Sequence, residues 1–426
     1  MNTTERSTRV VVVGQGYVGL PLAMRAVEAG HHVTGYDVDT NRVKLLTAGE
    51  SYVEDVPTGQ LRAAYDSGRY TVTSESRGCS GFDVAVITVP TPLRDGNPDL
   101  SYVEAAAHTL GRFLRPGATV VLESTTYPGT TEEFVAPILE EASGLLAGAD
   151  FHLGYSAERI DPGNRRWTFT TTPKVVSGID ERSLKVINQF YSGLVERTVP
   201  VASTREAELA KLLENTFRHV NIALVNEIAM FAHELGIDIW NVIDAASTKP
   251  FGYMRFTPGP GVGGHCLPID PSYLSWRVKR SLGRSFRFVE LANDVNEHMP
   301  DHVVSRLMVA LNRSQRAVNG ARILLLGLSY KPNTGDARES PAVTVAQQLL
   351  DLGAQVRGAD PHLREGLVER VVRVEVTPEE VSAADAVVVL TDHDDFDYDL
   401  VAAHASYVLD CRRRVPRDGA AQVELL

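Results

Sequence analysis

The chain has 426 residues, of which 43% are hydrophobic and 23% are charged, and its formal net charge is −12. A chain of this length exceeds what one hydrophobic core usually organises, so two or three domains are expected, and the composition excludes general disorder. The acidic balance argues against a nucleic-acid partner, because binding a phosphate backbone requires a basic face.

The sequence contains no sign of a membrane span, a signal peptide or a disulfide framework. No apolar run reaches the roughly 18 residues that a membrane span requires, and the N-terminal stretch MNTTERSTR lacks the apolar segment of a signal peptide. Cys79, Cys266 and Cys411 have neither CxxC nor metal-type spacing. We therefore expect a cytoplasmic protein with free thiols.

Residues 1–202 are predicted to form the first domain, with an α/β fold. Short β-branched runs alternate there with helical stretches, which is the pattern of βαβ units around a parallel sheet. The runs are RVVVVG, HHVTGYD, FDVAVITVP, ATVVLEST, FHLGYS and KVVSG.

A dinucleotide-binding motif follows the first run. Gly14, Gly16 and Gly19 have GxGxxG spacing between a predicted strand and a predicted helix, where glycines allow a tight turn, approach of a pyrophosphate and close helix packing. Asp37 follows Gly14 by 37 − 14 = 23 residues, and its carboxylate would bind a ribose 2′-hydroxyl, which favours NAD over NADP. The alternative is a glycine turn in a domain without a ligand. The predicted cofactor site also includes Tyr17, Val18 and Thr91.

Residues 203–314 are predicted to form a helical middle domain. One long helix extends from Thr204 to Leu235, with further helical pattern from Trp240 and from Phe288 to Asn312, and the loop from Lys249 to Pro271 is rich in Gly and Pro. The long helix is too apolar around its circumference to be buried on one side only, so we expect a homodimer or a multiple of it.

Polar residues share one face of this long helix. Lys211, Asn215 and Arg218 follow steps of four and three residues. A solvated stripe is the plainer interpretation of such a face. The neighbouring apolar residues indicate instead that much of the helix is buried; they are Leu212, Leu213, Phe217, Ile222 and Val225.

Residues 315–426 are predicted to form a second Rossmann-like domain, because strand-like runs return as ARILLLGLSY, AQVRGAD, ADAVVVLTD and YVLDCR, with a helix at 342–352. The predicted fold is therefore α/β, with two doubly wound domains joined by the helical domain. The acidic segment DHDDFD, residues 392–397, is interpreted as a solvated turn rather than a metal site, and no metal is predicted.

The loop GPGVGGHCLPID, Gly259 to Asp270, places Cys266 in a glycine-rich segment with an aspartate four residues later. Glycines there would let the backbone wrap closely around a ligand. Cys79 and Cys411 lie beside ordinary strand sequence and are expected to be small buried apolar groups.

Several motifs in order give this chain a family resemblance. They are GQGYVGLPLA, STTYPGT at 124–130, YSAERIDPGN at 155–164, KLLENTFRHVNIALVNE from Lys211, GVGGHCLPIDP and LLGLSYKPNTGDARESPA. Over essentially its full length the chain resembles the UDP-glucose/GDP-mannose dehydrogenase family. The resemblance implies NAD bound by the first domain, a nucleotide-sugar held largely by the third, and a dimer built on the long helix. The chain departs from the family at Ala157, where proline is usual, and at Gly335, where an acid is common.

The resemblance also implies roles for individual residues. Cys266 matches the nucleophile, and the residues that handle protons and water match Lys211, Asn215, Asp270, Glu158 and Thr125. Thr125 also lies near the transferred hydride, and Arg338 near the cofactor. The substrate-binding set comprises Glu158, Arg159, Lys211, Asn215, Arg218, Arg255, Gly261, Gly263, Gly264 and Lys331. In this set Arg255 is expected to reach the sugar of the partner subunit.

Oxidation of a CH2OH group to a carboxylate explains why a thiol is needed. The aldehyde formed first has no second hydride to give until a nucleophile adds to it. Cys266 would form a thiohemiacetal, a second hydride transfer would leave a thioester, and water would release the acid. Lys211 and Asn215 suit the oxyanion, and Asp270 and Glu158 are both candidates to activate the water.

Other functions are weaker interpretations. A β-hydroxyacid-type dehydrogenase leaves the Cys266 loop and everything after Ala321 unexplained, and an NAD-binding protein without activity needs no Cys266. The resemblance is closer to the branch of the family that acts on N-acetylated sugars, because of SAERIDPGN and of Arg218 with VNIALVNE. It implies UDP-GlcNAc or UDP-ManNAc as the substrate and a role in uronic acid and polysaccharide biosynthesis. UDP-glucose is the next candidate, followed by dTDP- and GDP-sugars.

Overall fold

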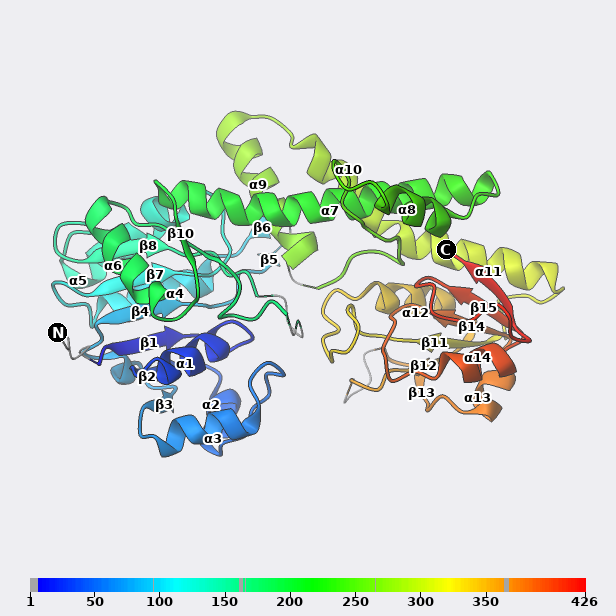
Figure 1. Ribbon diagram of the computed structural model, residues 1–426, viewed down its shortest axis with the longest axis horizontal. Coiled ribbons are helices and arrows are strands. Elements are labelled where there is room, and N and C mark those ends of the chain that lie inside the picture. The colour runs from blue at the N-terminus through cyan, green and yellow to red at the C-terminus, as the bar shows by residue number, and fades with distance from the viewer. Residues whose placement is uncertain (1–6, 95, 161–163, 165, 265, 364–367) are drawn as a thin grey trace. The chain divides into compact units, whose positions relative to one another are not determined.

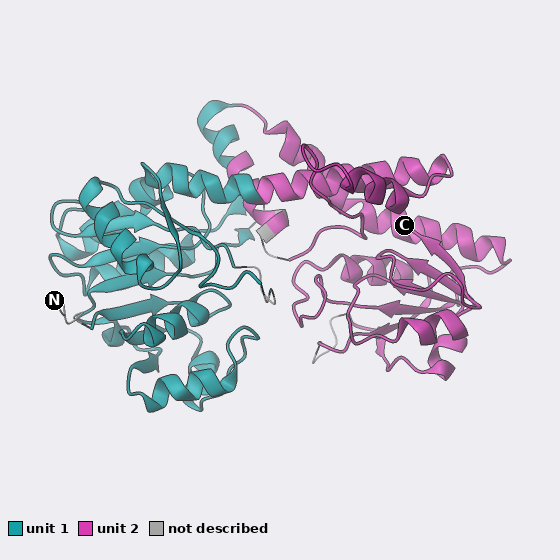
Figure 2. Ribbon diagram, in the orientation of Figure 1, with its two compact units in different colours: residues 1–214, 276–283 teal, residues 215–275, 284–426 magenta. Residues whose placement is uncertain are grey.

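The computed structural model (Figure 1) describes residues 7–94, 96–160, 164, 166–264, 266–363 and 368–426. The chain divides into two compact units, residues 1–214 with 276–283 and residues 215–275 with 284–426 (Figure 2). The division into three domains at residues 202/203 and 314/315 stays a prediction. No helix among the described residues is both long and apolar enough to cross a membrane.

The first unit is built on a parallel sheet with strand order β3-β2-β1-β4-β7-β8. Its strands are β1 (Arg9–Val13), β2 (His32–Tyr36), β3 (Tyr70–Thr73), β4 (Val84–Ile87), β7 (Thr119–Leu122) and β8 (His152–Tyr155). The strands β1, β4 and β7 are buried on both faces, which explains their continuous Val and Ile runs.

Short pairs of strands accompany this sheet. The predicted strand KVVSG forms β9 (Lys174–Val176), which pairs with β10 (Thr198–Pro200) and is not one of the six strands of the main sheet, contrary to the sequence interpretation. Just after β9, Ser177 N donates to Tyr155 O of β8 at 3.0 Å. β5 (Leu93–Arg94) pairs with β6 (Asn97–Pro98). A hydrophobic run predicts that a strand exists but not which neighbour it pairs with.

Helices cover the sheet of the first unit. They are α1 (Gly19–Glu28), α2 (Thr40–Thr47), α3 (Thr58–Asp66), η1 (Ser76–Cys79), α4 (Ser101–Gly111), η2 (Thr131–Val135), α5 (Ala136–Ser143) and α6 (Glu181–Ser192). Asp39 and Asp180 cap α2 and α6 by accepting from backbone amides of the first turn. The π-helical turn η2 leads directly into α5.

The long helix is α7 (Thr204–Glu234), close to its predicted bounds. Further helices are α8 (Ile239–Ser247), α9 (Cys266–Leu282), α10 (Arg287–Glu297) and α11 (Met299–Arg313). The predicted single helix from 288 to 312 is interrupted at His298, and Pro300 occupies the first turn of α11, where no amide donor is required.

The predicted loop from 249 to 271 ends earlier than expected, because α9 already begins at Cys266. Pro268 lies in the first turn, which tolerates proline, whereas Pro271 lies inside the helix and removes one backbone hydrogen bond. Gly and Pro density indicated a loop, but Pro268 stands in the first turn, where a helix can accept proline, and α9 continues past Pro271 despite the missing amide.

The second unit contains a parallel sheet with strand order β13-β12-β11-β14-β15-β16. Its strands are β11 (Arg322–Leu326), β12 (Gln355–Ala359), β13 (Val372–Arg373), β14 (Ala386–Val389), β15 (Tyr407–Asp410) and β16 (Gln422–Leu425), and its helices are α12 (Pro341–Asp351), α13 (Pro378–Ser382) and α14 (Tyr398–His404). Both sheets thus have the doubly wound order 3-2-1-4-5-6 when strands are counted within each sheet, which confirms the predicted fold class.

The shared topology recurs in atomic detail. The amide of Gly14 donates to Tyr36 O at 2.8 Å after β1, and the amide of Gly327 donates to Ala359 O at 2.9 Å after β11. In such sheets ligands bind beyond the carboxyl ends of the strands, where the strand order reverses. The two glycine turns stand at these positions.

Candidate active site

The three glycines after β1 are required for different physical reasons. Gly14 has φ +90°, and a Cβ there would stand 2.8 Å from Thr88 O. A Cβ on Gly19 would overlap Gly14 O and the Thr88 hydroxyl. Gly16 differs, because a Cβ there would meet no protein atom within 4 Å. Protein packing therefore explains Gly14 and Gly19, while the open space at Gly16 fits a pyrophosphate approaching the backbone.

The N-terminus of α1 suits an anion. Val18 is the N-cap residue of α1, and its apolar side chain makes no hydrogen bond to the amides of the first turn. A bound anion could accept from these amides. Tyr17 is exposed beside it. These features fit the predicted NAD diphosphate.

Asp37 follows β2 and is buried, as the sequence predicts for the end of that strand. Its carboxylate accepts from Gln15 N at 2.8 Å and from Asp39 N at 2.9 Å, and Arg42 lies 3.6 Å away. These bonds hold the carboxylate at the glycine turn. The role toward a ribose stays a prediction.

Sequence reasoning missed Gln15, which stands between the first two glycines. Its fully buried side chain donates to Val12 O at 2.9 Å and accepts from Tyr70 Oη at 2.7 Å, while Tyr52 Oη donates to Gln15 O at 2.5 Å. A polar residue inside an otherwise apolar glycine motif was the available signal. Gln15 supports the turn from within the domain.

The segment Ser124–Thr130, which carries Thr125, is held by a buried carboxylate on α7 that sequence reasoning also missed. Glu208 accepts from Gly129 N at 2.6 Å, Thr131 N at 2.9 Å and Thr131 Oγ1 at 2.7 Å, at the N-terminus of η2. Burial raises the pKa of Glu208 to about 7, against the opposing effect of these three donors. Thr125 is half-buried, and Thr91 is buried after β4.

Glu158 follows β8 and is buried. Its Oε1 accepts from Arg159 N at 2.7 Å and from Ile160 N, and its Oε2 accepts from Lys174 Nζ at 3.1 Å. Burial acts to raise the pKa of Glu158, but Lys174, Glu123 and the Ile160 amide together hold it below its ordinary value. Residues 161–163 of this motif lie outside the described residues.

Lys211 is buried on α7, and its positive charge also lowers the pKa of Glu158. The Arg159 guanidinium is held by two contacts: it forms an ion pair with Glu214 at 2.7 Å and donates a hydrogen bond to Pro173 O at 2.7 Å. The first unit thus brings Lys211, Glu158 and Arg159 into one charged neighbourhood.

In the second unit, Asn215 and Asp270 meet. Asn215 Nδ2 donates to Asp270 Oδ2 at 2.6 Å, and the Asp270 side chain is buried. Cys266 and Asp270 stand one turn apart on α9, which begins at Cys266. The side chain of Cys266 lies outside the described residues, but its backbone position is the N-terminus of a 17-residue helix, where negative charge is stabilised.

A buried amide network ties the loop before Cys266 to α7. Gly259 N donates to Asn226 Oδ1 at 3.0 Å, and Asn226 Nδ2 donates to Asn296 Oδ1 at 2.9 Å. His219 Nε2 lies 2.8 Å from Asn293 Oδ1, and burial lowers the pKa of His219. Sequence reasoning missed this network, because Asn and His on a helix have no motif spacing of their own.

The glycines of the loop pack against protein. A Cβ on Gly261 would stand 3.1 Å from Asn296 O, and one on Gly263 would stand 2.6 Å from Glu339 O and 2.7 Å from Tyr330 Cβ. Gly264 has φ +81° and faces the Tyr330 ring. Contacts with the protein itself are therefore sufficient to require glycine at these three positions. The sequence analysis had attributed the glycines to close approach of the backbone to a ligand.

Two of the remaining predicted substrate residues, Arg218 and Arg255, and the predicted cofactor residue Arg338 are exposed or paired within their own unit. Arg218 is exposed on α7. Arg255 pairs with Asp244 at 2.7 Å, and Arg338 pairs with Asp336 at 2.5 Å in the loop after β11. Their roles toward ligands stay predictions.

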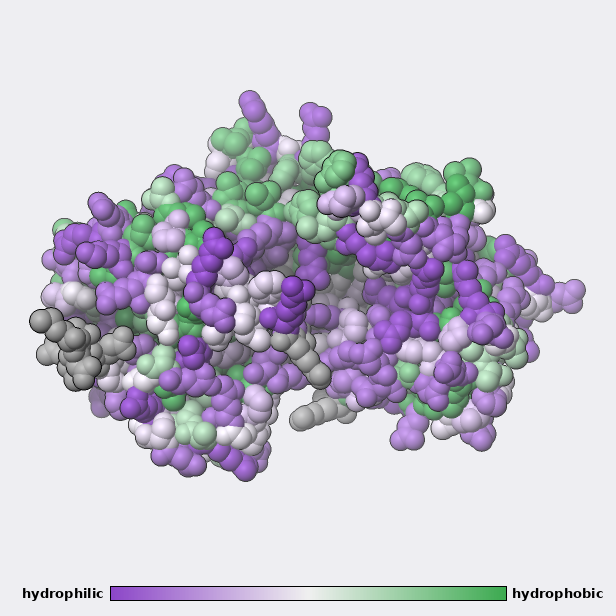
Figure 3. Space-filling view, in the orientation of Figure 1, coloured by the Kyte–Doolittle hydropathy of each residue, from purple (hydrophilic) through white to green (hydrophobic). Residues whose placement is uncertain are grey.

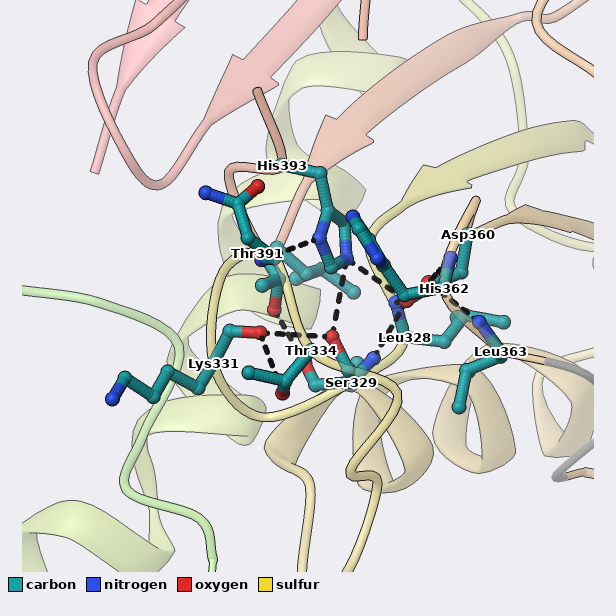
Figure 4. A network of polar contacts seen from close by, with 12 residues as sticks. Leu328, Ser329, Lys331, Thr334, Asp360, His362, Leu363, Thr391 and His393 are labelled. Atoms are coloured by element: carbon teal, nitrogen blue, oxygen red, sulfur yellow. Dashed lines mark hydrogen bonds and ion pairs between the residues drawn. The ribbon is translucent and has the colours of Figure 1, made fainter. Parts of the chain in front are cut away.

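Figure 4 shows a polar network at the carboxyl ends of β11, β12 and β14, with the Lys331 side chain directed away from it. His393 Nε2 lies 3.0 Å from Asp360 Oδ2 and 3.1 Å from Ser329 Oγ, while Nδ1 accepts from Asn333 N at 2.9 Å. Ser329 and Asp360 therefore meet the same ring nitrogen, which excludes the relay of a Ser-His-Asp triad.

This network also corrects the interpretation of residues 392–397 as a solvated turn. His393 is fully buried and Phe396 is buried, although Asp394, Asp395 and Asp397 are exposed. The acidic residues gave the segment its polar character in the sequence, but the histidine among them turns inward. Cys79 and Cys411 are buried as predicted, and burial raises the pKa of each thiol to about 12.

Comparisons with known proteins cover almost the whole chain. Three family profiles of the UDP-glucose/GDP-mannose dehydrogenase family match: the NAD binding domain at residues 8–195, the central domain at 205–298 and the UDP binding domain at 324–417. The chain is 36% identical to a UDP-N-acetyl-D-mannosamine dehydrogenase of Pyrococcus horikoshii, over 91% of this chain and 90% of that protein. It is 37% identical to a UDP-N-acetyl-D-glucosamine 6-dehydrogenase of Pseudomonas aeruginosa, over 84% and 83%.

Solved structures agree with this relationship. A UDP-D-ManNAc dehydrogenase from Pyrococcus horikoshii has a TM-score of 0.88 at 33% identity, covering 97% of this chain and 98% of that chain. A UDP-glucose dehydrogenase from Pyrobaculum islandicum has a TM-score of 0.87 at 31% identity, covering 100% and 98%. With the glycine turn shaped for NAD and all three domains matched in order, the chain belongs to the UDP-glucose/GDP-mannose dehydrogenase family of NAD-dependent oxidoreductases.

Proposed function

We propose that this protein oxidises the C6 hydroxymethyl group of a UDP-N-acetylhexosamine to a carboxylate, with Cys266 holding the intermediate covalently. The observation that carries the proposal is the 2.6 Å bond from Asn215 to Asp270, which fixes a proton-handling pair one helical turn from Cys266 on α9. A dehydrogenase that makes a ketone in one step has no use for a thiol at this position.

The chain's residues divide the chemistry as follows. NAD, when bound, accepts one hydride in each of the two oxidations. The Cys266 thiolate adds to the aldehyde carbon to give a thiohemiacetal, whose C–H hydride leaves to give a thioester. Water then adds to the thioester carbonyl, and the C–S bond breaks to release the acid and the thiol. The sum is one alcohol, one water and two NAD giving one acid, two NADH and two protons.

Charged and polar groups serve the tetrahedral stages. Lys211 and Asn215, one turn apart on α7, are suited to stabilise the oxyanion. Glu158, held at one oxygen by two backbone amides and at the other by Lys174, presents a fixed carboxylate to order the hydrolytic water. Asp270, bound to Asn215, is the second candidate for this task.

The substrate class rests on the relatives. Those compared above are named for UDP-N-acetyl-D-mannosamine and UDP-N-acetyl-D-glucosamine, which supports an N-acetylated sugar here. UDP-glucose is the second candidate, because the Pyrobaculum islandicum enzyme named for it has nearly the same TM-score as the ManNAc enzyme.

The test of substrate is NADH formation with UDP-GlcNAc, UDP-ManNAc, UDP-glucose and the dTDP- and GDP-sugars, compared by kcat/KM. The highest value is expected for a UDP-N-acetylhexosamine, with two NADH formed per sugar. A higher value for UDP-glucose would transfer the assignment to the second candidate.

The test of covalent catalysis is substitution of Cys266. Cys266→Ser is expected to lose several orders of magnitude in turnover, because an alkoxide is a poorer leaving group than a thiolate, and to show a stalled adduct by intact mass. Cys266→Ala should form no adduct while still binding NAD. Acid formation by Cys266→Ala at the wild-type rate would refute the covalent mechanism.

The proposed assembly is a homodimer formed through α7. Large apolar side chains on this helix are exposed at steps of three, four and seven residues: Phe217, Leu224, Ile228 and Phe231. Figure 3 shows hydrophobic side chains gathered over the C-terminal half of α7 and over α8 and α10. A second copy of the chain would cover a continuous stripe of this kind.

A further inference from the structure

Behind Glu158 lies a buried ion cluster that the proposed chemistry does not use. Lys174, the first residue of β9, pairs with Glu123 and, at 3.1 Å, with Glu158. The exposed fractions of the three side chains are 4% for Lys174, 0% for Glu123 and 10% for Glu158. Glu123 stands directly after β7.

Every polar group of the cluster has a partner. Tyr191 Oη on α6 donates to Glu123 Oε2 at 2.7 Å. The Lys174 ammonium also lies 5.2 Å from the ring centroid of Phe169 and 5.4 Å from that of Tyr191. The Glu158 carboxylate is thereby fixed on the side of Lys174, and the two backbone amides fix its other oxygen.

Such a cluster is an expensive way to fill a core. Taking two carboxyl groups and an ammonium out of water costs several kcal/mol for each ion, and apolar residues of similar volume often stabilise a protein as well or better. A buried ion cluster therefore calls for a purpose other than stability. Its position, in direct contact with Glu158, points to the ionisation and orientation of that residue.

The two carboxyl groups experience opposite electrostatic conditions. Burial, opposed by Lys174 and reinforced by Glu158, raises the pKa of Glu123 to about 8. The pKa of Glu158 is instead held below its ordinary value, with Lys174 the largest favourable influence and Lys211 of α7 a further one. At neutral pH the proton therefore resides on Glu123, and Glu158 is the carboxylate.

We propose that Lys174 and Glu123 are positioning residues for Glu158: Lys174 holds the Glu158 carboxylate charged and in one orientation, and Glu123 holds the ammonium from the other side. This inference rests on the proposed function, in which Glu158 orders the hydrolytic water. The groups that face Glu158 are Glu123 after β7, Lys174 on β9 and Lys211 on α7, with Tyr191 of α6 behind Glu123.

The decisive variant is Lys174→Met, which keeps the length of the side chain and removes the charge. An opposite charge in contact lowers a carboxyl pKa by about 1–3 units, so its loss should move the acidic limb of the kcat profile upward by about that amount. KM for the UDP-sugar should change less than about threefold, because Lys174 is not placed at the substrate. Lys185→Met, at an exposed position on α6, is the matched control and should leave the profile unchanged.

A second variant separates electrostatics from packing. Lys174→Arg keeps the positive charge in a side chain of different shape, so its acidic limb should stay near that of wild type. A purely structural role for Lys174 predicts instead a uniform fall in kcat at every pH in both variants, with no shift of the limb. An unshifted limb in Lys174→Met, or a limb in Lys174→Arg shifted as far as that of Lys174→Met, overturns the proposal.

Glu123→Gln alone keeps the test open if Lys174→Met does not fold. Its acidic limb should stay in place or move to lower pH, because the Lys174 ammonium then pairs with Glu158 only, and a shift to higher pH overturns the proposal.

The pH dependence of stability gives a readout that needs no substrate. A carboxyl group whose folded pKa is raised to about 8 binds more protons folded than unfolded between that value and the unfolded value of 4.5. Wild-type Tm should therefore fall from pH 6 to pH 9 more than that of Glu123→Gln, and parallel curves overturn the assignment of the proton to Glu123.

The proposed function is tested by other measurements than the Lys174 variants, so the two proposals can fail independently. If wild type does not form two NADH per UDP-sugar, or if Cys266→Ala retains activity, the reaction assignment is wrong whatever the Lys174 variants show. If wild type and Cys266→Ala behave as proposed and only the Lys174 profile is unshifted, the positioning inference alone is wrong.

Discussion

Two glycines of this chain should respond to the same methyl group in opposite ways. Gly16→Ala adds a Cβ that meets no protein atom within 4 Å, and its φ is not positive, so alanine is compatible with the backbone. Gly263→Ala adds a Cβ at 2.6 Å from Glu339 O, 2.7 Å from Tyr330 Cβ and 2.9 Å from Pro341 Cδ. The first position is open and the second is closed by the protein itself.

The expected free energies follow from these distances. Gly16→Ala should raise the free energy of unfolding by about 0.4–1 kcal/mol, because alanine narrows the unfolded ensemble. It should weaken NAD binding by about tenfold or more, which corresponds to about 1.4 kcal/mol, because the methyl group occupies the approach of the pyrophosphate. Gly263→Ala should lower the free energy of unfolding by about 1–3 kcal/mol through overpacking, with NAD affinity unchanged.

The assay combines thermal unfolding with calorimetric titration of NAD into each variant. For a unit of about 200 residues, 1 kcal/mol moves Tm by about 2–4 °C, so the two variants should shift in opposite directions by measurable amounts. A destabilised Gly16→Ala that binds NAD as tightly as wild type would refute the assignment of the open space to the cofactor. A Gly263→Ala of wild-type stability would refute the packing explanation of the cysteine loop.

Three further predictions concern the cofactor, the long helix and the segment around Thr125. Wild type should prefer NAD over NADP by a large factor, and Asp37→Ala should narrow that gap in kcat/KM; equal use by wild type would show that Asp37 does not face the ribose. Light scattering should give a dimer or a multiple of it, and Phe231→Glu should shift the protein toward monomer, whereas a monomeric wild type would exclude the α7 interface. Glu208→Ala leaves two backbone amides and a hydroxyl without their acceptor, so it should cost about 3–5 kcal/mol of stability and accelerate hydrogen exchange at Gly129, and a cost below about 1 kcal/mol would contradict the capping role.

The fold could be predicted where residues are buried on both sides. Runs such as VVVV before Gly14 and LLL before Gly327 became central strands, because a central parallel strand is apolar at every position. The edge strands β3, β13 and β16 were not predicted, since they are partly exposed and lack such runs. Their pairing depends on the sheet beside them rather than on their own composition.

Helix boundaries failed where proline was counted without its position. The loop rich in Gly and Pro was extended to Pro271, although α9 begins at Cys266.

The apolar residues of α7 led to a wrong prediction of burial. Leu213 and Phe217 indicated burial, yet their exposed fractions in the single chain are 64% and 46%. Periodicity identifies the apolar stripe of a helix but not whether the same chain covers it.

The site residues that sequence reasoning identified are those with a motif, and the residues it missed are those that support them. Asp37 and Glu158 stand at predicted strand ends. Gln15 contacts Asp37 from a position that the glycine motif leaves variable, and Lys174 contacts Glu158 from a strand position without recognisable spacing. Glu208 could have been found from the sequence, because it precedes Lys211 by three residues and therefore lies on the same face of α7. The structure shows that its side chain is buried. Supporting residues are selected by three-dimensional packing, which one-dimensional spacing does not encode.

In the second unit, amide side chains connect the start of α9, the loop before it and α10 to the long helix α7. Asn215 bonds Asp270 on α9, Asn226 bonds the amide of Gly259, and Asn226 in turn bonds Asn296 of α10. Amide side chains keep their hydrogen bonds only at short range and in fixed directions, so this network fixes Gly259, at the start of the loop before α9, against α7. Covalent catalysis needs such placement, because a displacement of about 1 Å at a reacting centre costs about a hundredfold in rate. The buried asparagines are therefore as much a part of the proposed reaction as the residues that touch the sugar.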